Sequence, residues 1–194
     1  MEKLYQIKRI YTKKALFHNA TEMPTNWHEC WIFKEISEMI KILFICHGNI
    51  CRSPMAEFVF KDMVEKRGLA DRFEIASAAT STEEIWNGVG NPVYPPAREE
   101  LAKHGISCDG KRAVQLKKSD YDAYDYLIGM DYMNIKNIER MTGYQGGKIK
   151  LLLSFAGEDR PISDPWYTGD FRKTYEDVVK GCEALLRCID GKTL

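Results

Sequence analysis

Short apolar runs alternate, from residue 41 onward, with longer stretches in which apolar residues recur every three or four positions. Short runs bounded by polar residues are typical of buried strands, and a spacing of three or four is typical of helices with one buried face. The predicted strands are 41–45, 73–76, 124–130 and 149–153, and the predicted helices are 54–67, 97–104, 131–141 and 171–189. Strands that alternate with helices predict an α/β fold, in which a four-stranded parallel sheet is flanked by helices on both sides.

Residues at the ends of these elements support the boundaries. Pro54 suits the first position of a helix, and Ser53 suits the N-cap position before it. Asp131 is expected to cap the third helix. The segment 77–81 predicts a turn at the end of the second strand, and the segment 87–96, which is rich in glycine and proline, predicts a loop.

Residues 1–38 differ from the rest because their periodicity is weak and they carry no recognisable motif. We expect an irregular N-terminal extension, weakly structured or not translated at all, ahead of a domain at 39–194. Residues 34–35 can be encoded by a purine-rich sequence of the kind that binds bacterial ribosomes, and three codons separate it from Met39. The alternative is an accessory helix with one apolar face. Its apolar members would be Trp27, Trp31, Ile32 and Ile36.

The composition is that of a globular chain of 194 residues with a formal net charge of zero. A balanced charge gives no electrostatic reason to expect nucleic acid or an anionic membrane as a partner. No apolar run approaches the length of about 20 residues that spans a bilayer. The six cysteines are irregularly spaced and form no C-x-x-C pair, which argues against a disulfide framework or a zinc site. A reducing, cytoplasmic setting without a metal or other cofactor is therefore expected.

The candidate chemistry lies in the segment Ile-Cys-His-Gly-Asn-Ile-Cys-Arg-Ser-Pro at 45–54. It leads from a predicted strand to the N-terminus of a predicted helix, where unpaired amides and the helix dipole favour an anion. Cys46 lies in this field, which favours the nucleophilic thiolate, and Gly48 lets the backbone turn its amides inward. Arg52 can offer two parallel donors to the oxygens of a phosphate. The pattern predicts a phosphate-binding loop after the first strand, with its own nucleophile.

A cysteine with a purely structural role is the alternative. A lone cysteine after an apolar strand is usually a small packed side chain, and the spacing of cysteine and arginine also arises by chance. Here a glycine between the two, a strand before them and a Ser-Pro pair that opens a helix occur together. This combination favours the phosphate site.

Residues 46–54 resemble the signature loop of the low-molecular-weight protein tyrosine phosphatases. The chain resembles the bacterial members of this family, and the resemblance extends over 39–189. It implies that Cys46 attacks phosphorus and that Arg52 binds the phosphoryl oxygens. The other loop residues are implied to bind the substrate or to hold the loop. They are His47, Gly48, Asn49, Ile50, Cys51 and Ser53.

Two residues outside the loop are implied to support it. Ser77 follows the second predicted strand, where the family has a serine that supports the phosphate loop. Asp131 follows the third predicted strand and is expected to pack near the back of the loop.

A second group of candidate catalytic and binding residues is Asp164-Pro165, followed by Trp166 and Tyr167. It comes after an unusually long loop, and long loops in compact domains are often functional. Read alone, Asp-Pro is usually the start of a turn, and the aromatics are ordinary packing residues. The resemblance implies instead that Asp164 is the general acid and that Trp166 and Tyr167 wall a slot that admits phosphotyrosine, whereas phosphoserine is too short.

The implied reaction is metal-independent hydrolysis of phosphotyrosine through a cysteinyl-phosphate intermediate. The partner would be a tyrosine-phosphorylated protein, of which a bacterial tyrosine kinase is one candidate, and the enzyme would be a monomer or weak homodimer.

Three rival functions stay open. Phosphoarginine phosphatases of the same fold prefer threonine at the position of Ile50 and lack the double aromatic. Thioredoxin-coupled arsenate reductases need a further cysteine pair, and only Cys108 lies in the right region. A phosphocarrier or other anion-binding module would need neither Arg52 nor Asp164.

Lys111 and Glu83 depart from the family pattern, and Cys51 has two possible roles. Lys111 stands where members often carry a histidine that bonds the loop asparagine, so the support of Asn49 is an open question. Glu83 stands where eukaryotic members carry an aromatic at the slot, which predicts a rim less favourable to acidic substrates. Cys51 could form a reversible disulfide with Cys46 or simply pack under the loop.

Overall fold

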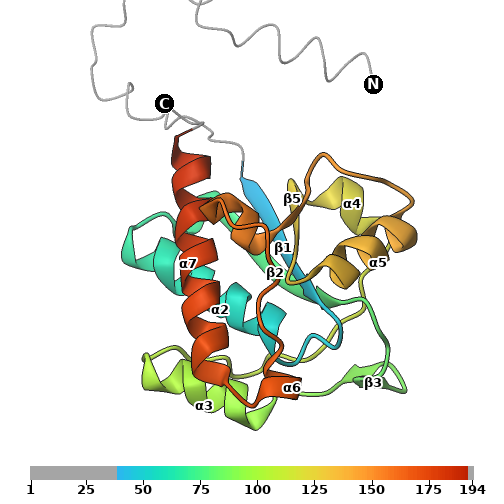
Figure 1. The fold of residues 1–194 in the computed structure, drawn as a ribbon, viewed down its shortest axis with the longest axis horizontal. Helices are drawn as coiled ribbons and strands as arrows, with labels where there is room; N and C mark the ends of the chain where they lie inside the picture. Colours follow the sequence, from blue (N-terminus) through green and yellow to red (C-terminus); the bar gives the residue numbers. More distant parts are fainter. Residues whose placement is uncertain (1–38, 192–194) are drawn as a thin grey trace, which may run out of the picture. The chain divides into compact units, whose positions relative to one another are not determined.

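The computed structural model describes residues 39–191 (Figure 1). The expectations for residues 1–38 lie outside this range, as does the end of the predicted domain at 192–194. In chain order the elements are β1 (Ile40–Cys46), α2 (Arg52–Lys66), η2 (Ala70–Arg72), β2 (Phe73–Ala79), β3 (Ile85–Trp86), β4 (Val89–Gly90), α3 (Pro95–Lys103), α4 (Asp120–Ala123), β5 (Tyr126–Gly129), α5 (Tyr132–Thr142), β6 (Ile149–Leu151), η3 (Leu152–Ala156), α6 (Pro165–Thr168) and α7 (Phe171–Asp190).

Four strands form a parallel sheet in the order β2-β1-β5-β6, which confirms the predicted architecture. Side chains of the central strand β1 alternate between the two faces of the sheet. Phe44 and Cys46 join a core with α2, α3 and α7, whereas Leu43 and Ile45 join a core with α5. Figure 1 shows these helices on the two sides of the sheet. β1 is therefore a rigid, buried base for the loop that follows Cys46.

Helix α7 packs closely against η3, the segment that directly follows β6. A side chain at Gly181 would place its first carbon 2.5 Å from Cγ of Leu152 in η3, which is closer than real contacts allow. Glycine at this position lets the helix approach η3. This contact fixes the start of the segment that leads to Asp164. Among residues 39–191, no helix is both long enough and apolar enough to span a membrane.

Some predicted boundaries are wrong because tertiary contacts decide them. The turn predicted at 77–81 begins too early, since β2 continues to Ala79 and pairs with the end of β1. Ser53 is not the N-cap, because α2 already begins at Arg52 and buries Ser53 in its first turn. Pro95 opens α3 instead of lying in a loop, in a position where its missing N–H costs nothing.

Other short elements escape the hydrophobic pattern. The predicted loop 87–96 contains part of the hairpin β3–β4, which turns at Asn87 and Gly88 with positive φ angles of 49° and 78°. Helix α4 was not predicted, and β5 and β6 are shorter than 124–130 and 149–153. The predicted cap of α5 is confirmed, because a side-chain oxygen of Asp131 accepts a hydrogen bond from the amide of Asn134 at 2.7 Å.

Candidate active site

The loop between β1 and α2 folds back on the sulfur of Cys46. The amide of Asn49 donates to Cys46 Sγ at 3.2 Å, and the hydroxyl oxygen of Ser53 lies 3.0 Å from the same sulfur. Helix α2 begins at Arg52, so its positive dipole end points at the loop. The sulfur therefore lies in surroundings that suit a negative charge on or next to it.

Asn49 holds the loop in an unusual backbone conformation, with a φ of 58°. Its Nδ2 donates to the hydroxyls of Ser53 and Ser77 at 2.9 and 2.8 Å, and its Oδ1 accepts from the amide of Val114 at 3.1 Å. Asparagine tolerates left-handed backbone better than most residues. These three hydrogen bonds, made while Asn49 is only 1% exposed, lock the turn that brings its amide to Cys46.

Lys111 continues this support from behind. The hydroxyl of Ser77 donates to Glu57 Oε2 at 2.5 Å, and Lys111 Nζ lies 2.8 Å from the same carboxylate oxygen and 3.1 Å from the carbonyl oxygen of Ser77. Burial alone would raise the pKa of Glu57, but the charge of Lys111 offsets this and holds the pKa below its ordinary value. The lysine thus acts on Asn49 through Glu57 and Ser77, which answers the question that the sequence left open.

Replacing Lys111 with methionine should destabilise the fold in a pH-dependent way. Lys111 is one of two lysines that pair with the buried carboxylate of Glu57, and its loss leaves only the partly exposed Lys61, so we expect a cost of up to about 3 kcal/mol. Glu57 in the native chain stabilises the fold above its ordinary pKa of 4.5, and this contribution disappears as the pH falls through its lowered folded value. In the variant, Glu57 keeps Lys61 and the hydroxyl of Ser77 but loses the charge of Lys111, so its pKa should rise from the native value and acid should relieve part of the destabilisation.

Thermal unfolding between pH 7 and pH 5 measures this effect. Lys66→Met is the matched control, because Lys66 pairs with Asp62 at the surface, where ion pairs contribute little. A loss of stability for Lys111→Met that is the same at both pH values, or no larger than that of the control, would contradict the role given to Lys111.

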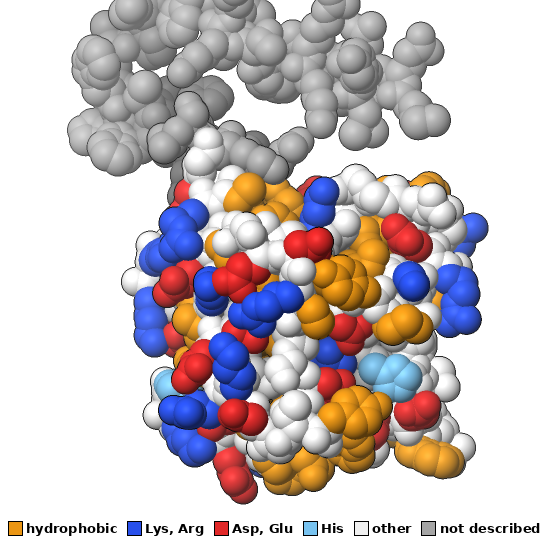
Figure 2. All heavy atoms as spheres, viewed as in Figure 1, with side chains coloured by type: hydrophobic (Ala, Val, Ile, Leu, Met, Phe, Trp, Pro, Cys, Tyr) orange, Lys and Arg blue, Asp and Glu red, His pale blue; other side chains and the backbone are white. Residues whose placement is uncertain are grey.

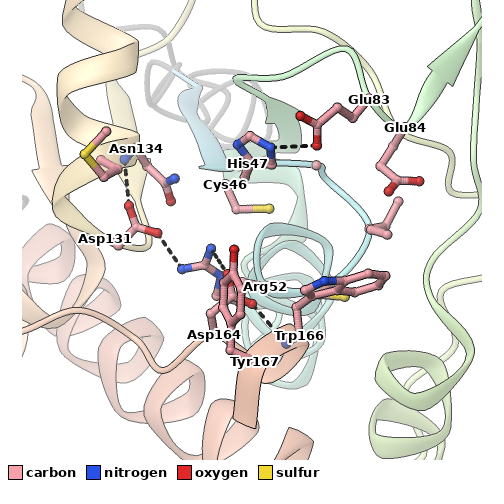
Figure 3. A pocket seen from close by; sticks show the side chains of 14 residues that line it. Cys46, His47, Arg52, Glu83, Glu84, Asp131, Asn134, Asp164, Trp166 and Tyr167 are labelled. Atoms are coloured by element: carbon pink, nitrogen blue, oxygen red, sulfur yellow. Dashed lines mark hydrogen bonds and ion pairs between the residues drawn. The ribbon is translucent and has the colours of Figure 1, made fainter. Parts of the chain in front are cut away.

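Arg52 joins the loop to two carboxylates from distant parts of the chain. Its Nη1 donates to Asp131 Oδ2 at 2.6 Å and its Nη2 donates to Asp164 Oδ2 at 2.5 Å (Figure 3). Burial opposes its charge, but the neighbouring Cys46, Asp164 and Asp131 groups raise the pKa of Arg52 above its ordinary value. The guanidinium is therefore charged and fixed beside Cys46. Asp131 faces the pocket through this contact and does not lie behind the loop.

Cys51 lies in the same loop, yet its chemistry differs from that of Cys46. Burial and the neighbouring Cys46 raise the pKa of the Cys51 thiol to about 12. At neutral pH Cys51 is a protonated thiol, which is a poor nucleophile. Cys46 and Cys51 are both buried, and it is the sulfur of Cys46 that lies next to the amide of Asn49 and the hydroxyl of Ser53.

These groups meet in a cavity of about 390 Å³. Its lining consists of Cys46, His47, Gly48, Ile50, Cys51, Arg52, Glu83, Glu84, Asp131, Met133, Asn134, Asp164, Trp166 and Tyr167. Figure 3 shows Cys46 and Arg52 at its centre, with Asp131 and Asn134 on one side and Glu83 and Glu84 on another. Asn49, Ser53 and Ser77 lie behind the loop instead, so the structure places them as supports.

The two aromatics after Asp164 form an exposed wall of this cavity. Trp166 is 59% exposed and packs against Tyr94 with ring centroids 5.4 Å apart, and Tyr167 is 85% exposed. Asp164 also caps the short helix α6, since its Oδ1 accepts from the amide of Trp166 at 3.1 Å. Asp164 therefore has both expected features. It caps a short helix, as Asp-Pro often does at a turn, and it places its carboxylate in the pocket.

The loop before Asp164 is fastened to α7. Two nitrogens of Arg160 donate to the two carboxylate oxygens of Asp177 at 2.8 and 2.9 Å, and the hydroxyl of Thr174 donates to the carbonyl oxygen of Ser163 at 3.1 Å. Asp177 is 2% exposed. Burial alone would raise its pKa, but Arg160 keeps the pKa below its ordinary value. These anchors determine where Asp164 stands.

Several residues of the site carry no signal that sequence reasoning could detect. Glu57 is one charged position on a helix, and Asn134, Glu84 and Met133 belong to no motif. Only the fold brings them to the loop. Among residues 39–191, no group of three or more histidine, cysteine, aspartate or glutamate side chains is arranged to hold a metal ion.

Comparison with known proteins gives one consistent family. Residues 41–193 match the family described as low molecular weight phosphotyrosine protein phosphatase. The low molecular weight protein-tyrosine-phosphatase YfkJ of Bacillus subtilis is 40% identical over 154 residues, which is 78% of this chain and 96% of that protein. Its crystal structure superposes with a TM-score of 0.75 over 80% of this chain and 98% of that one.

Two further relatives widen the comparison. The low molecular weight phosphotyrosine protein phosphatase of Gallus gallus is 37% identical over 155 residues, which is 77% of this chain and 95% of that protein. The structure described as DARP, drosophila arginine phosphatase, has a TM-score of 0.69 at 31% identity and covers 77% of this chain and 98% of its own.

Proposed function

This chain belongs to the low-molecular-weight phosphotyrosine protein phosphatase family and is an enzyme of that type, and we propose that Cys46, Arg52 and Asp164 carry its reaction. The observation that supports this assignment is that Asp164 meets Cys46 and Arg52 of the phosphate loop in one cavity, although it lies 112 positions after Arg52 in the chain. A nucleophile, a fork of phosphate donors and a carboxyl group at hydrogen-bonding distance of that fork are the parts that phosphoryl transfer through a cysteine requires.

In the first step, the Cys46 thiolate attacks phosphorus in line with the tyrosyl oxygen. The phosphorus–oxygen bond breaks as the sulfur–phosphorus bond forms. Arg52 and the amides at the start of α2 hold the equatorial oxygens, where charge is spread in the transition state. The support of Asn49 by Ser77 keeps the sulfur at a fixed distance from these donors.

Asp164 gives its proton to the departing tyrosyl oxygen. Phosphate oxygens bound to Arg52 replace the hydrogen bond that Asp164 accepts from Nη2, which leaves the carboxyl group of Asp164 free to face the departing tyrosyl oxygen. In the second step, the resulting carboxylate takes a proton from water, which attacks the cysteinyl phosphate. Inorganic phosphate leaves, and Cys46 is a thiolate again.

Phosphotyrosine is the substrate that the walls of the cavity favour. Trp166 and Tyr167 offer flat apolar faces to a phenyl ring, and Ile50 adds an apolar side chain to the lining. The similarity to the drosophila arginine phosphatase makes phosphoarginine the second candidate. A guanidinium group can also stack on aromatic faces, so the two substrates are compared directly.

Matched peptides that carry phosphotyrosine or phosphoarginine at the same position test this assignment. With EDTA present, we expect rapid, repeated turnover of the first peptide and at least about tenfold lower kcat/KM on the second, which corresponds to about 1.4 kcal/mol. Preference for phosphoarginine would overturn the substrate. Release of a single equivalent of dephosphorylated peptide per chain, with the phosphoryl group retained on the protein, would indicate a phosphocarrier instead.

The cellular setting is proposed on the same basis. The substrate is a tyrosine-phosphorylated protein, and a tyrosine kinase of the same cell is the candidate we propose. A thiolate nucleophile requires a reducing compartment, so we propose the cytoplasm, with the enzyme acting as a monomer or weak homodimer.

Cys51 provides a testable form of redox protection. Peroxide converts the Cys46 thiolate to a sulfenic acid. The small thiolate fraction of Cys51 can attack this sulfur, so that a disulfide forms and water leaves, and thiols reduce the disulfide. We expect dithiothreitol to restore activity after peroxide treatment of the native chain, but not of Cys51→Ser. Full recovery of that variant would show that Cys51 only packs under the loop. Cys108→Ser is the control, because this buried cysteine does not line the cavity.

A further inference from the structure

The mouth of the cavity carries an excess of negative charge. Four of the residues that line the cavity carry carboxylates, namely Glu83, Glu84, Asp131 and Asp164. Arg52 is the one lysine or arginine in the lining. Asp131 and Asp164 both pair with Arg52, which is buried at the bottom. Glu83 and Glu84 are therefore the carboxylates whose charge faces whatever surrounds the phosphate group of a substrate.

Both glutamates are held in place beside the phosphate loop. Glu83 Oε2 lies 3.0 Å from Nε2 of His47, and Glu84 Oε2 accepts from Nδ2 of Asn91 at 2.7 Å. Cγ of Glu84 lies 3.0 Å from the place that a side chain on Gly48 would occupy, so it packs against the loop itself. Each of the two carboxylates therefore has a partner at the entrance, His47 for Glu83 and Asn91 for Glu84.

Exposed apolar side chains share this entrance. Met133, Trp166 and Tyr167 line it, and Trp86 in the hairpin next to Glu84 is 71% exposed. Figure 2 shows apolar side chains gathered at the lower part of this face, around the position of α6, whereas basic and acidic side chains are mixed over α7. A surface of apolar patches and carboxylates suits a peptide that carries positive charge.

We propose that the mouth selects phosphotyrosine sites flanked by lysine or arginine, and that Glu83 and Glu84 make this selection. The inference rests on the proposed function, because the phosphotyrosine side chain must enter the cavity and leave its neighbours at the entrance. The phosphate reaches Arg52 and the helix N-terminus, while flanking side chains meet the two glutamates. Flanking acidic residues would be repelled by the same charges.

Peptides that differ only in the residues on either side of phosphotyrosine, lysine in one and glutamate in the other, measure the effect. At low salt we expect kcat/KM to be about fivefold higher for the lysine peptide, as one or two exposed ion pairs allow. The difference should lie mainly in KM, and it should shrink at high salt because ions screen exposed charges.

Three variants assign the effect to residues. Glu83→Gln should reduce the ratio of the two kcat/KM values, Glu83→Lys should bring it to one or invert it, and Glu99→Gln should leave it unchanged. Glu99 is an exposed carboxylate on α3 that does not line the cavity. The native chain alone tests the proposal through the two peptides and the salt series, so it stays testable even where a variant fails to fold.

The outcomes separate this inference from the function on which it rests. Equal kcat/KM for the two peptides, a preference for the glutamate peptide, or a ratio that Glu83→Lys does not change would overturn the selection by charge while leaving the phosphatase reaction intact. Failure to hydrolyse either peptide would overturn the proposed function itself.

Discussion

Replacing Cys46 with serine should abolish turnover of phosphotyrosine peptides, with a fall in kcat on the order of 10⁴–10⁶-fold, as is typical when a nucleophile is removed. A serine hydroxyl stays protonated at neutral pH, so the attack on phosphorus is lost. The donors of the cradle remain, because Arg52 and Asn49 keep their partners at Asp131 and Ser77. The variant should therefore still bind phosphotyrosine peptides and hold them.

Steady-state kinetics and peptide binding together check this result. Cys188→Ser is the matched control, since Cys188 lies in α7 and does not line the cavity, and it should retain activity. Substantial turnover by Cys46→Ser would show that another group attacks phosphorus. Loss of both binding and folding would show that Cys46 is above all a packing residue of β1.

The second large effect is expected for Asp164→Asn. An uncharged amide cannot protonate the leaving oxygen, so kcat should fall by about 10²–10⁴-fold for phenyl phosphate and phosphotyrosine. The loss should be much smaller for p-nitrophenyl phosphate, because nitrophenolate departs without a proton. Asparagine can still accept from the amide of Trp166 and cap α6, so the local structure should persist.

The dependence on the leaving group is the decisive measurement. Asp170→Asn is the comparison, because Asp170 caps α7 by accepting from the amide of Lys173 at 2.8 Å and does not line the cavity. Equal losses for good and poor leaving groups in Asp164→Asn would show that Asp164 positions Arg52 or the helix and does not act as an acid.

The sequence predicts those parts of the fold that local patterns decide. The buried β1, the cap at Asp131 and the four parallel strands follow from periodicity and from residue preferences at helix ends. The start of α2 does not follow. Ser53 has the chemistry of an N-cap, but its hydroxyl lies between Cys46 and Asn49, and these partners are brought to it by the fold of the loop.

Within the site, too, the sequence reveals the residues of short motifs but not those that only tertiary packing brings together. Cys46, Arg52 and Asp164 stand out because each belongs to a short motif, although no motif tells that Arg52 and Asp164 touch across 112 positions. Lys111 and Glu57 carry no motif at all. Their value comes from burial next to one another, and burial of a charged pair depends on tertiary packing that single positions do not reveal.

The anchoring of the Asp164 loop to α7 affects when the active site can form during synthesis on the ribosome. The phosphate loop is synthesised early, but domains generally fold as units. The carboxylate of Asp164 comes much later, and Arg160 can hold its loop only after Asp177 in α7 has been synthesised and packed. Because α7 also completes the core beneath Cys46, the phosphate loop and the carboxylate of Asp164 reach their places together, when this helix docks.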